Sequence, residues 1–376
     1  MLHRGRNNLL VTWWWTLDKF TFLLVLLLIG LGFIFITSAS PPVAERIGLD
    51  SFFFVKKHII YAFLSLGLVI GFSMLDKNQI RLLSWAGLIL CLVMLVAVLL
   101  LGEEIKGAKR WISIFGFSLQ PSEFVKPFIA VANGWLLSKY TNHKDIKSFK
   151  YSFILYIIFA GLIILQPDVG MMVTVTAICG AQIFLAGLPI IFAFLILIFF
   201  IFSLVGAYMF FPHVAKRIDG FLSADSADNF QVNKSIMAIS KGGLFGKGPG
   251  EGVVKNSIPD SHADFIFAVI GEELGMFFAL GIITIYALIV IRGYFKVVHA
   301  KELFTIYTVV GLLTQIALQS IVNIGVAVKL MPAKGMTLPF LSYGGSSMLA
   351  VSMTMGMVLA LTRKRYGLLK KGSLNI

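Results

Sequence analysis

The sequence is poor in charged residues and in cysteine. Only 13% of its 376 residues are charged and 58% are hydrophobic, whereas an average soluble domain carries about 25% charged residues. This shortage of charge excludes a soluble globular domain and indicates a protein with several membrane spans. The two cysteines, Cys91 and Cys179, lie far apart in apolar runs. We therefore expect buried thiols and neither a disulfide nor a metal pair.

Long apolar runs dominate the chain instead. A window of roughly 20 residues predicts about ten transmembrane helices, so we expect an all-α integral membrane protein in which residues 1–376 form a single bundle. The unbroken runs exclude a β-barrel, because barrel strands alternate. The first run lacks a small-residue cleavage site and is interpreted as a retained span. The predicted spans lie near residues 20–38, 59–75, 82–101, 121–138, 152–166, 168–187, 189–211, 263–291, 304–330 and 341–362.

The net charge of +14 indicates orientation rather than nucleic-acid binding, because the basic residues lie mostly in short loops. The N-terminal arm, the 139–150 loop and the tail after residue 362 are all basic. We therefore expect both termini in the cytoplasm and no nucleic-acid partner. The opposite side then holds one large extracytoplasmic loop, about residues 212–262. Apolar residues within this loop predict that it is partly ordered along the membrane.

One predicted span begins with an unusual charged pair. Pro121-Ser-Glu123 resembles a helix start, with proline early and an acid in the first turn. Glu123 and Lys126 are spaced i, i+3 and share a helix face. An ion pair inside a membrane is costly and tends to face a cavity or pathway. We expect this pair to line a central cavity, and a purely structural pair is the alternative.

Two segments near the predicted outer side break the apolar pattern. The glycine-rich segment Gly242–Gly252 is no P-loop, because neither Ser nor Thr follows Lys247. It is either a flexible hinge or a mobile loop over an extracytoplasmic site. Leu338–Ser347 combines proline, paired glycines and hydroxyls, as expected of irregular backbone that lines a cavity or of close helix packing. Asn323 in the preceding span is expected to face the same interior.

Asp264 lies where the large loop re-enters the membrane, and Glu272 and Glu273 follow within the apolar run. One interpretation of Asp264 is a first-turn acid favoured by the helix dipole. The other is an outer carboxylate that faces an anionic, membrane-anchored substrate, with cations of the neighbouring loops nearby. Glu272 and Glu273 are expected to pair with Lys126 or with another cation.

Several motifs carry a family resemblance, namely Lys106–Trp111, Gln120–Glu123 with Lys126, Gly242–Gly248, Pro259–Phe267 and Phe340–Ser346. On these motifs the chain resembles the SEDS family of membrane glycosyltransferases, the group of RodA and FtsW, over nearly its whole length. It is more similar to FtsW at Ile36–Ser40 and Phe53–Lys57. Asp260 and Ala263 depart from the usual Glu and Thr of the family, and Pro249 departs from its glycine segment.

The resemblance implies an enzyme that polymerises lipid II into β-1,4 glycan strands outside the membrane, with inversion at the anomeric carbon. It implies that Asp264 is catalytic, as a general base or as a ligand to a divalent cation, Mg²⁺ or Mn²⁺. The implied substrate and cavity residues are Lys109, Arg110, Trp111, Glu123, Lys126, Lys255, His262, Asn323, Ser342, Tyr343, Gly344, Gly345 and Ser346.

The resemblance also implies partners and a location. The partners are a class B penicillin-binding protein transpeptidase and other division proteins, and the location is the bacterial cytoplasmic (inner) membrane at the division septum. Three alternatives stay open. The intramembrane charge pair and the broken helices also fit a lipid II flippase. The chain could instead be a scaffold that docks division proteins, or the elongation polymerase of the RodA type.

Overall fold

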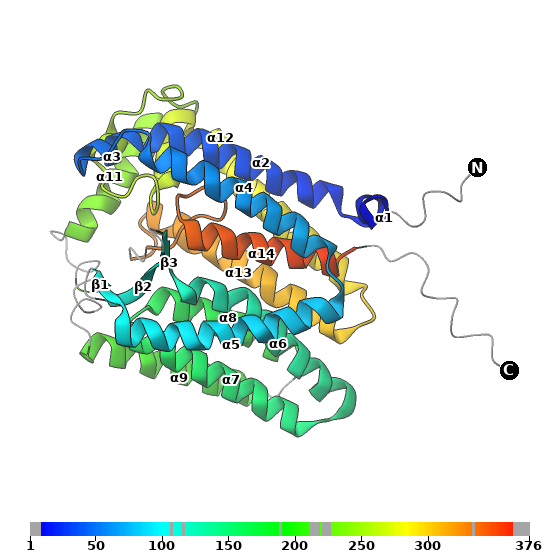
Figure 1. Cartoon of the computed structure of the whole chain (residues 1–376). Coiled ribbons are helices and arrows are strands. Elements are labelled where there is room, and N and C mark those ends of the chain that lie inside the picture. Colours follow the sequence, from blue (N-terminus) through cyan, green and yellow to red (C-terminus); the bar gives the residue numbers. More distant parts are fainter. Residues whose placement is uncertain are drawn as a thin grey trace, which may run out of the picture.

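A computed structural model of the chain describes residues 9–105, 108–114, 117–187, 190–210, 215, 219, 227–332 and 335–363. The long helices lie side by side with their axes roughly parallel (Figure 1). A small sheet, with the short helix α3 and with α11, lies at one end of the bundle, which we call the sheet end. The short helix α1 lies at the opposite end.

The described residues form a helix at each predicted span and three further helices, α1, α3 and α11, that were not predicted as spans. Their bounds are α1 Leu9–Thr16, α2 Lys19–Ala39, α3 Pro41–Arg46, α4 Phe53–Met74, α5 Lys77–Leu101, α6 Pro121–His143, α7 Ile146–Leu165, α8 Val169–Leu185, α9 Ile190–Phe210, α11 Ala227–Gly242, α12 Ile266–Val298, α13 Leu303–Ala327 and α14 Gly345–Leu361, with a 3₁₀ turn at Val254–Ser257. Every predicted span overlaps one of these helices. By length and composition, six helices among the described residues could cross a membrane: α2, α4, α5, α7, α12 and α13. The predicted class, a helical membrane protein, is confirmed.

A three-stranded antiparallel sheet was not predicted. It consists of β1 Glu103–Ile105, β2 Ala108–Ile114 and β3 Phe117–Leu119, in the order β1-β2-β3. The sequence indicated only a basic, aromatic turn here. The strands are too short to give a period-2 signal, and their pairing depends on contacts across the turns.

α13 is the most buried of the six helices that could cross a membrane. α13 is 72% buried over its most apolar window, whereas the corresponding windows of α4, α5 and α12 are 28% buried. Large apolar side chains on the outer helices stay exposed, such as Phe63 (74%) and Leu82 (73%), as expected for surfaces that face lipid. α6 and α13 pack closely through Gly134, because a Cβ there would lie 2.6 Å from Thr308 Oγ1.

The predicted extracytoplasmic loop 212–262 lies partly outside the described residues. From residue 227 onward it contains α11 and the 3₁₀ turn, and both pack against α12. The side chains of Val232 and Ala238 on α11 are buried in a cluster with Phe265 and Ala268. This part of the loop therefore packs into the helical core at the sheet end.

Candidate active site

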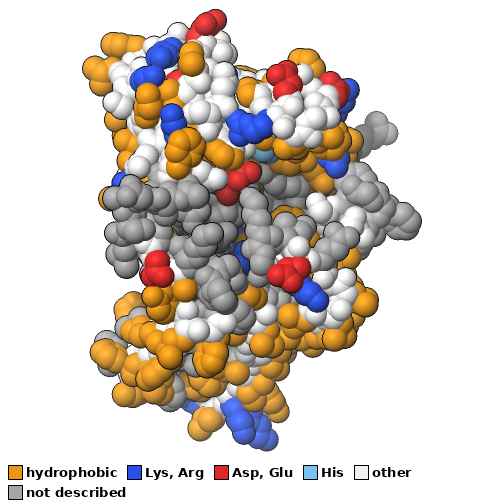
Figure 2. Space-filling model, turned by 90° about the vertical axis from the view of Figure 1, so that its left-hand side faces the viewer, with side chains coloured by type: hydrophobic (Ala, Val, Ile, Leu, Met, Phe, Trp, Pro, Cys, Tyr) orange, Lys and Arg blue, Asp and Glu red, His pale blue; other side chains and the backbone are white. Residues whose placement is uncertain are grey.

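A cavity of about 310 Å³ lies at the sheet end of the bundle. Its wall is built by β2, β3, the α7–α8 turn, the turn before α12 and the segment 335–347. Figure 2 views this end, where acidic and basic side chains lie around the middle of the face and hydrophobic side chains cover its lower flank. The polar lining residues are Tyr61, Arg110, Trp111, Ser118, Gln120, Glu123, Asp168, Asp260, Asp264, Thr337, Tyr343, Ser346 and Ser347.

The cavity brings together part of the predicted site. The predicted residues that line it are Arg110, Trp111, Glu123, Asp264, Tyr343, Gly344, Gly345 and Ser346. The predicted residues outside its lining are Lys109, Lys126, Lys255, His262, Asn323 and Ser342. Some of the second group hold the first in place. Ser342, for example, accepts a hydrogen bond at Oγ from the backbone N–H of Leu338 (2.8 Å) and so fixes the turn that precedes α14.

Asp264 lies in a turn two residues before α12, so the interpretation of it as a first-turn acid of this helix is wrong. Its backbone N–H donates to the carbonyl of Asp260 (3.1 Å), and both carboxyl-bearing residues line the cavity. The side chain of Asp264 is partly exposed. A partly solvated carboxylate beside a cavity can accept a proton or bind a cation, so the predicted role of Asp264 is compatible with its position in this turn.

Three amide side chains form a stripe on α13, and Asn323 at the end of the stripe supports this turn. Gln315, Gln319 and Asn323 are spaced i, i+4, i+8 and therefore share one helix face. Asn323 Nδ2 donates to the carbonyls of Asp264 (2.9 Å) and Met336 (2.6 Å). Asn323 was predicted from the sequence, but Gln315 and Gln319 were not. Their regular spacing in an apolar helix was the signal that could have found them.

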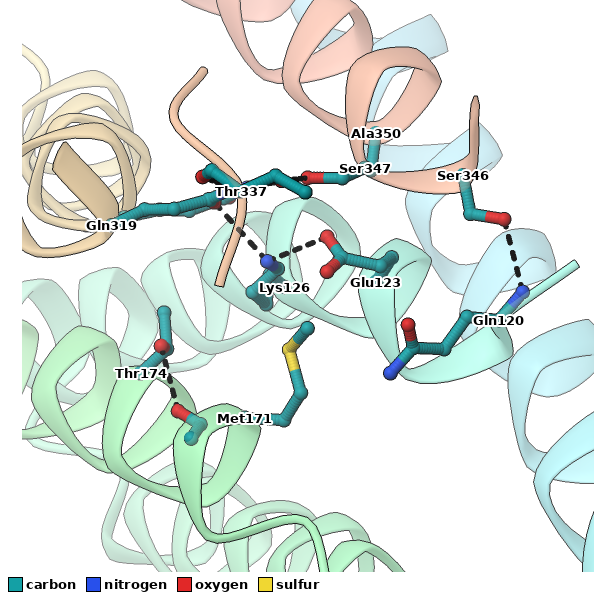
Figure 3. Close-up of polar contacts among 12 residues, drawn as sticks. Gln120, Glu123, Lys126, Met171, Thr174, Gln319, Thr337, Ser346, Ser347 and Ala350 are labelled. Carbon is teal, nitrogen blue, oxygen red and sulfur yellow. Dashed lines mark hydrogen bonds and ion pairs between the residues drawn. The ribbon is translucent and has the colours of Figure 1, made fainter. Parts of the chain in front are cut away.

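The Glu123–Lys126 pair forms as predicted, with Lys126 Nζ 2.7 Å from Glu123 Oε2. Lys126 is fully buried, and its ammonium also donates to Gln319 Oε1 (3.2 Å). Gln319 Nε2 in turn donates to Ser347 Oγ (2.9 Å) and to the carbonyl of Thr337 (3.0 Å) (Figure 3). A buried charge is tolerated only when it is paired and hydrogen-bonded. This network therefore keeps Glu123 in the cavity lining charged, with the ammonium of Lys126 behind it.

Arg110 and Asp168 fasten the sheet to the α7–α8 turn. Arg110 Nε donates to the carbonyl of Gln166 (3.1 Å), and its Nη2 donates to the carbonyl of Pro167. Asp168 lies 3.9 Å from Arg110 Nε, accepts a hydrogen bond from Gln120 Nε2 (3.1 Å) and caps α8. Asp168 lines the cavity but was missed. An aspartate directly before an apolar run was the available signal.

His262 and Tyr343 form an aromatic stack behind the cavity. Their ring centroids are 5.3 Å apart, and the backbone N–H of Tyr343 donates to the carbonyl of His262 (2.9 Å). Burial lowers the pKa of His262 to about 4 and raises the pKa of Tyr343 above its usual value. Both rings are therefore neutral at pH 7. The imidazole of His262 packs against the Tyr343 ring and holds it in the cavity wall.

Lys255, Glu272 and Glu273 form a separate buried cluster. Lys255 Nζ donates to Glu273 Oε1 (2.5 Å) and to Ser38 Oγ (2.7 Å). Glu272 accepts three backbone hydrogen bonds, from the N–H groups of residues 253, 254 and 255 (2.8 to 2.9 Å). The partner of Glu273 is thus Lys255 and not Lys126. Lys255 was predicted to contact the substrate, but in the structure it joins the loop before α12 to that helix.

The glycine-rich segment packs tightly on a break in α12. Gly275 has φ 79° and ψ −178°, a conformation open in practice only to glycine. A Cβ on Gly246 would lie 2.2 Å from the carbonyl oxygen of Glu273, and one on Gly242 would lie 1.9 Å from that of Gly271. Four backbone hydrogen bonds join the two segments, including Met276 N–H to the carbonyl of Gly243 (2.9 Å). In this structure the segment is therefore docked on α12, and the hinge and the mobile loop stay predictions.

Fold and site together define a helical membrane protein with a carboxylate-bearing cavity at one end of its bundle. A family model described as a cell cycle protein, for the group FtsW, RodA and SpoVE, matches residues 18–367. The chain belongs to this family, and the resemblance read from its motifs is confirmed.

Named relatives and solved structures agree with this family membership. A probable peptidoglycan glycosyltransferase FtsW of Caulobacter vibrioides is 40% identical over 97% of this chain and 94% of its own length. Stage V sporulation protein E of Bacillus subtilis is 35% identical over 92% of this chain and 97% of its own length. The crystal structure of the rod shape determining protein RodA of Thermus thermophilus covers 94% of this chain and 99% of its own, at 26% identity and TM-score 0.69. A chain of a peptidoglycan synthase complex covers 92% of this chain and 97% of its own, at 25% identity and TM-score 0.75.

Proposed function

We propose that this chain is a peptidoglycan glycosyltransferase that polymerises lipid II into β-1,4 glycan strands during cell division. Family membership and the FtsW relative, 40% identical over 97% of the chain, support the reaction class. The observation that carries the proposal is the position of Asp264, a partly exposed carboxylate on a fixed turn of the cavity wall.

The chemistry follows from the position of this carboxylate. The acceptor sugar hydroxyl attacks the anomeric carbon of the donor, and the bond from that carbon to the lipid pyrophosphate breaks. Asp264 takes the proton of the attacking hydroxyl as general base. The electron pair of the broken bond leaves with the pyrophosphate, and an α-linked donor gives a β-linked product. Arg110 contributes a positive charge to the cavity wall, where the pyrophosphate charge grows.

A divalent cation, Mg²⁺ or Mn²⁺, fits the residues of the same turn. Asp260 and Asp264 place two carboxyl groups on one wall, and Mg²⁺ commonly uses one or two carboxylates with substrate phosphates and water. Within the described ranges, no group of three or more His, Cys, Asp and Glu side chains could hold a metal ion. As the alternative to its role as general base, Asp264 would hold the cation together with Asp260 and the substrate. When bound, it would supply positive charge to the departing pyrophosphate.

The deciding experiment is polymerisation of purified lipid II by the full chain in detergent, with its cognate class B transpeptidase. Wild type is compared with Asp264→Asn, which keeps the volume of the side chain and removes the base. Asp145→Asn is the matched control, because Asp145 caps α7 far along the chain from the cavity lining. Glycan ladders from wild type and control but not from Asp264→Asn support the proposal. Ladders from all three would reject Asp264 as the base.

A lipid II flippase is the second candidate, and the buried Glu123–Lys126 pair (2.7 Å) favours it. Intramembrane ionisable residues often mark transport pathways. In that case Glu123→Gln and Lys126→Met would abolish lipid II transfer between vesicle leaflets while Asp264→Asn would not. If Asp264→Asn lost polymerisation of lipid II but kept its transfer between leaflets, polymerisation and transfer would depend on different residues.

We further propose the partner and the place of action. The similarity to a chain of a peptidoglycan synthase complex supports a penicillin-binding protein partner, and we assign the class B transpeptidase and other division proteins. The FtsW relatives favour the division septum of the inner membrane over the elongation role of the RodA type. The basic loops favour cytoplasmic termini and an extracytoplasmic cavity. Fluorescent fusions that localise to midcell before constriction would support this assignment, and lateral localisation would favour elongation.

A further inference from the structure

A second, larger cavity lies at the end of the bundle opposite the sheet. It has a volume of about 730 Å³ and opens between the α4–α5 turn, the last turns of α6 and the α12–α13 turn. It shares no lining residue with the cavity of the candidate active site. Nothing in the glycosyltransferase reaction uses it.

The wall of this cavity carries an excess of positive charge. The charged side chains in its lining are Lys77, Arg81 and Lys301, with Asp76 and Glu302. Both acids are already engaged. Asp76 forms the capping box of α5, and Glu302 is ion-paired with Lys77. Among the described residues, no carboxylate lies within ion-pair distance of Arg81 or Lys301, so these two cations are available to a ligand.

Arg81 is held at the cavity wall by an aromatic contact. Its guanidinium carbon lies 5.4 Å from the ring centroid of Trp135, and Lys139 Nζ lies 4.0 Å from the same ring. A cation over an indole face is attracted to it, which orients the planar guanidinium without neutralising it. Lys139 adds a further positive charge close to the cavity. An arginine fork of this kind is suited to binding a phosphate through two parallel hydrogen bonds.

The residues around the cavity are suited to a lipid, because apolar side chains lie next to the cations. Leu303 and Phe304 supply apolar lining beside the cations. Directly after Arg81, Leu82 (73% exposed) and Leu83 (41% exposed) face outward from α5. In the orientation proposed above, this end meets the cytoplasmic leaflet, whose anionic lipids are bound by basic pockets between transmembrane helices. We propose that this cavity binds the phosphate headgroup of an anionic phospholipid of the cytoplasmic leaflet.

The position of the cavity gives such binding a consequence. A headgroup held there would bridge the first turns of α5 and α13 and the last turns of α6. Anything that binds the folded state and not the unfolded state stabilises the fold. Phosphatidylglycerol should therefore raise the unfolding temperature of the purified chain, and phosphatidylcholine should not.

The test uses the full chain in an uncharged detergent, with native mass spectrometry to count retained lipids. Phosphatidylglycerol is titrated against phosphatidylcholine for wild type, for Arg81→Ala/Lys301→Ala and for Lys147→Ala/Lys150→Ala. The last variant removes two exposed cations of α7 at the same end of the bundle, outside the cavity lining. We expect the cavity variant to bind phosphatidylglycerol about thirtyfold more weakly than wild type. The α7 variant should match wild type.

Each contrary result is distinct. Equal binding of phosphatidylglycerol by the cavity variant and wild type would overturn the site, provided that both unfold at the same temperature without lipid. Equal retention of phosphatidylcholine would overturn the requirement for an anionic headgroup. Displacement of the lipid by millimolar inorganic phosphate would assign the site to free phosphate instead. Polymerisation of lipid II is measured in a separate assay. The lipid-binding result can therefore be interpreted even if the chain does not catalyse the proposed reaction.

Discussion

Asn323 donates a hydrogen bond from Nδ2 to the main-chain carbonyl of Asp264 over 2.9 Å and a second one to the carbonyl of Met336 over 2.6 Å. One amide therefore holds two cavity-lining segments in register, the turn before α12 and the segment before α14. It holds the backbone of Asp264 through its carbonyl oxygen, and the carboxylate takes no part in this bond. The tie therefore fixes the position of the Asp264 backbone in the cavity wall.

Replacing Asn323 should therefore impair catalysis more than folding. Asn323→Leu keeps the size but leaves two carbonyls without this donor, and a misplaced catalytic group can cost about a hundredfold in rate. We expect a fall of that order in lipid II polymerisation, measured by glycan product per minute. Ser320→Ala is the matched control, because the Ser320 hydroxyl donates within α13, to the carbonyl of Ile316, and has no other hydrogen-bond partner among the described residues. Equal rates for both variants would refute the positioning role of Asn323.

The buried ion pair makes a prediction about stability. Lys126→Met leaves the Glu123 carboxylate buried without its cation, which typically costs about 3–5 kcal/mol. The double variant Glu123→Leu/Lys126→Met removes both charges and should regain most of that loss. Thermal unfolding in detergent measures both. A double variant that unfolds at the same temperature as Lys126→Met would show that the pair is not the source of the loss.

The docked glycine segment predicts a large difference between two alanine substitutions. Gly246→Ala would bring a Cβ to 2.2 Å from the carbonyl oxygen of Glu273, at φ 80°. Gly250→Ala has a similar φ of 84° but no atom within 4 Å, so it isolates the cost of the left-handed backbone, about 1–2 kcal/mol. We expect Gly246→Ala to lower the unfolding temperature clearly more than Gly250→Ala. If both variants lowered the unfolding temperature by a similar amount, the glycine-rich segment would have moved to relieve the clash at residue 246.

His262 predicts a pH dependence of stability. Burial lowers its folded-state pKa to about 4 from an ordinary 6.5, so below pH 6.5 the unfolded chain binds a proton that the folded chain does not. This contribution to stability is complete above pH 6.5 and is lost as the pH falls toward 4, by about 3 kcal/mol at most. His262→Phe keeps a ring and removes the titration. Its stability relative to wild type should therefore rise as the pH falls through this window, as urea unfolding at pH 7, 5.5 and 4.5 would measure.

The sequence predicted the helices well because their signal is local. Long apolar runs in a chain with few charges leave little choice of structure, and each predicted span overlaps a helix. The Glu123–Lys126 pair was predictable for the same reason, since i, i+3 spacing within one helix fixes the neighbours.

The parts that could not be predicted depend on contacts between distant segments. Lys255 and Glu273 are 18 residues apart and meet only because the outer loop folds back onto α12. Asp168 reaches Gln120 across 48 residues. The sheet at 103–119 has strands too short to show a period. In each case the residue type was visible, but its partner was set by the packing of the bundle.

The break at Gly275 interrupts α12 without leaving the helix free to bend there. The glycine-rich segment is hydrogen-bonded on both sides of the break. Its residues 247 and 248 donate to carbonyls before Gly275, and after the break the N–H groups of Met276 and Phe277 donate to carbonyls of the segment. The segment is therefore a splint across the interruption, and a bend of α12 at this point would break hydrogen bonds on at least one side of it. The turn that carries Asp264 is thereby held in a fixed relation to the whole of α12.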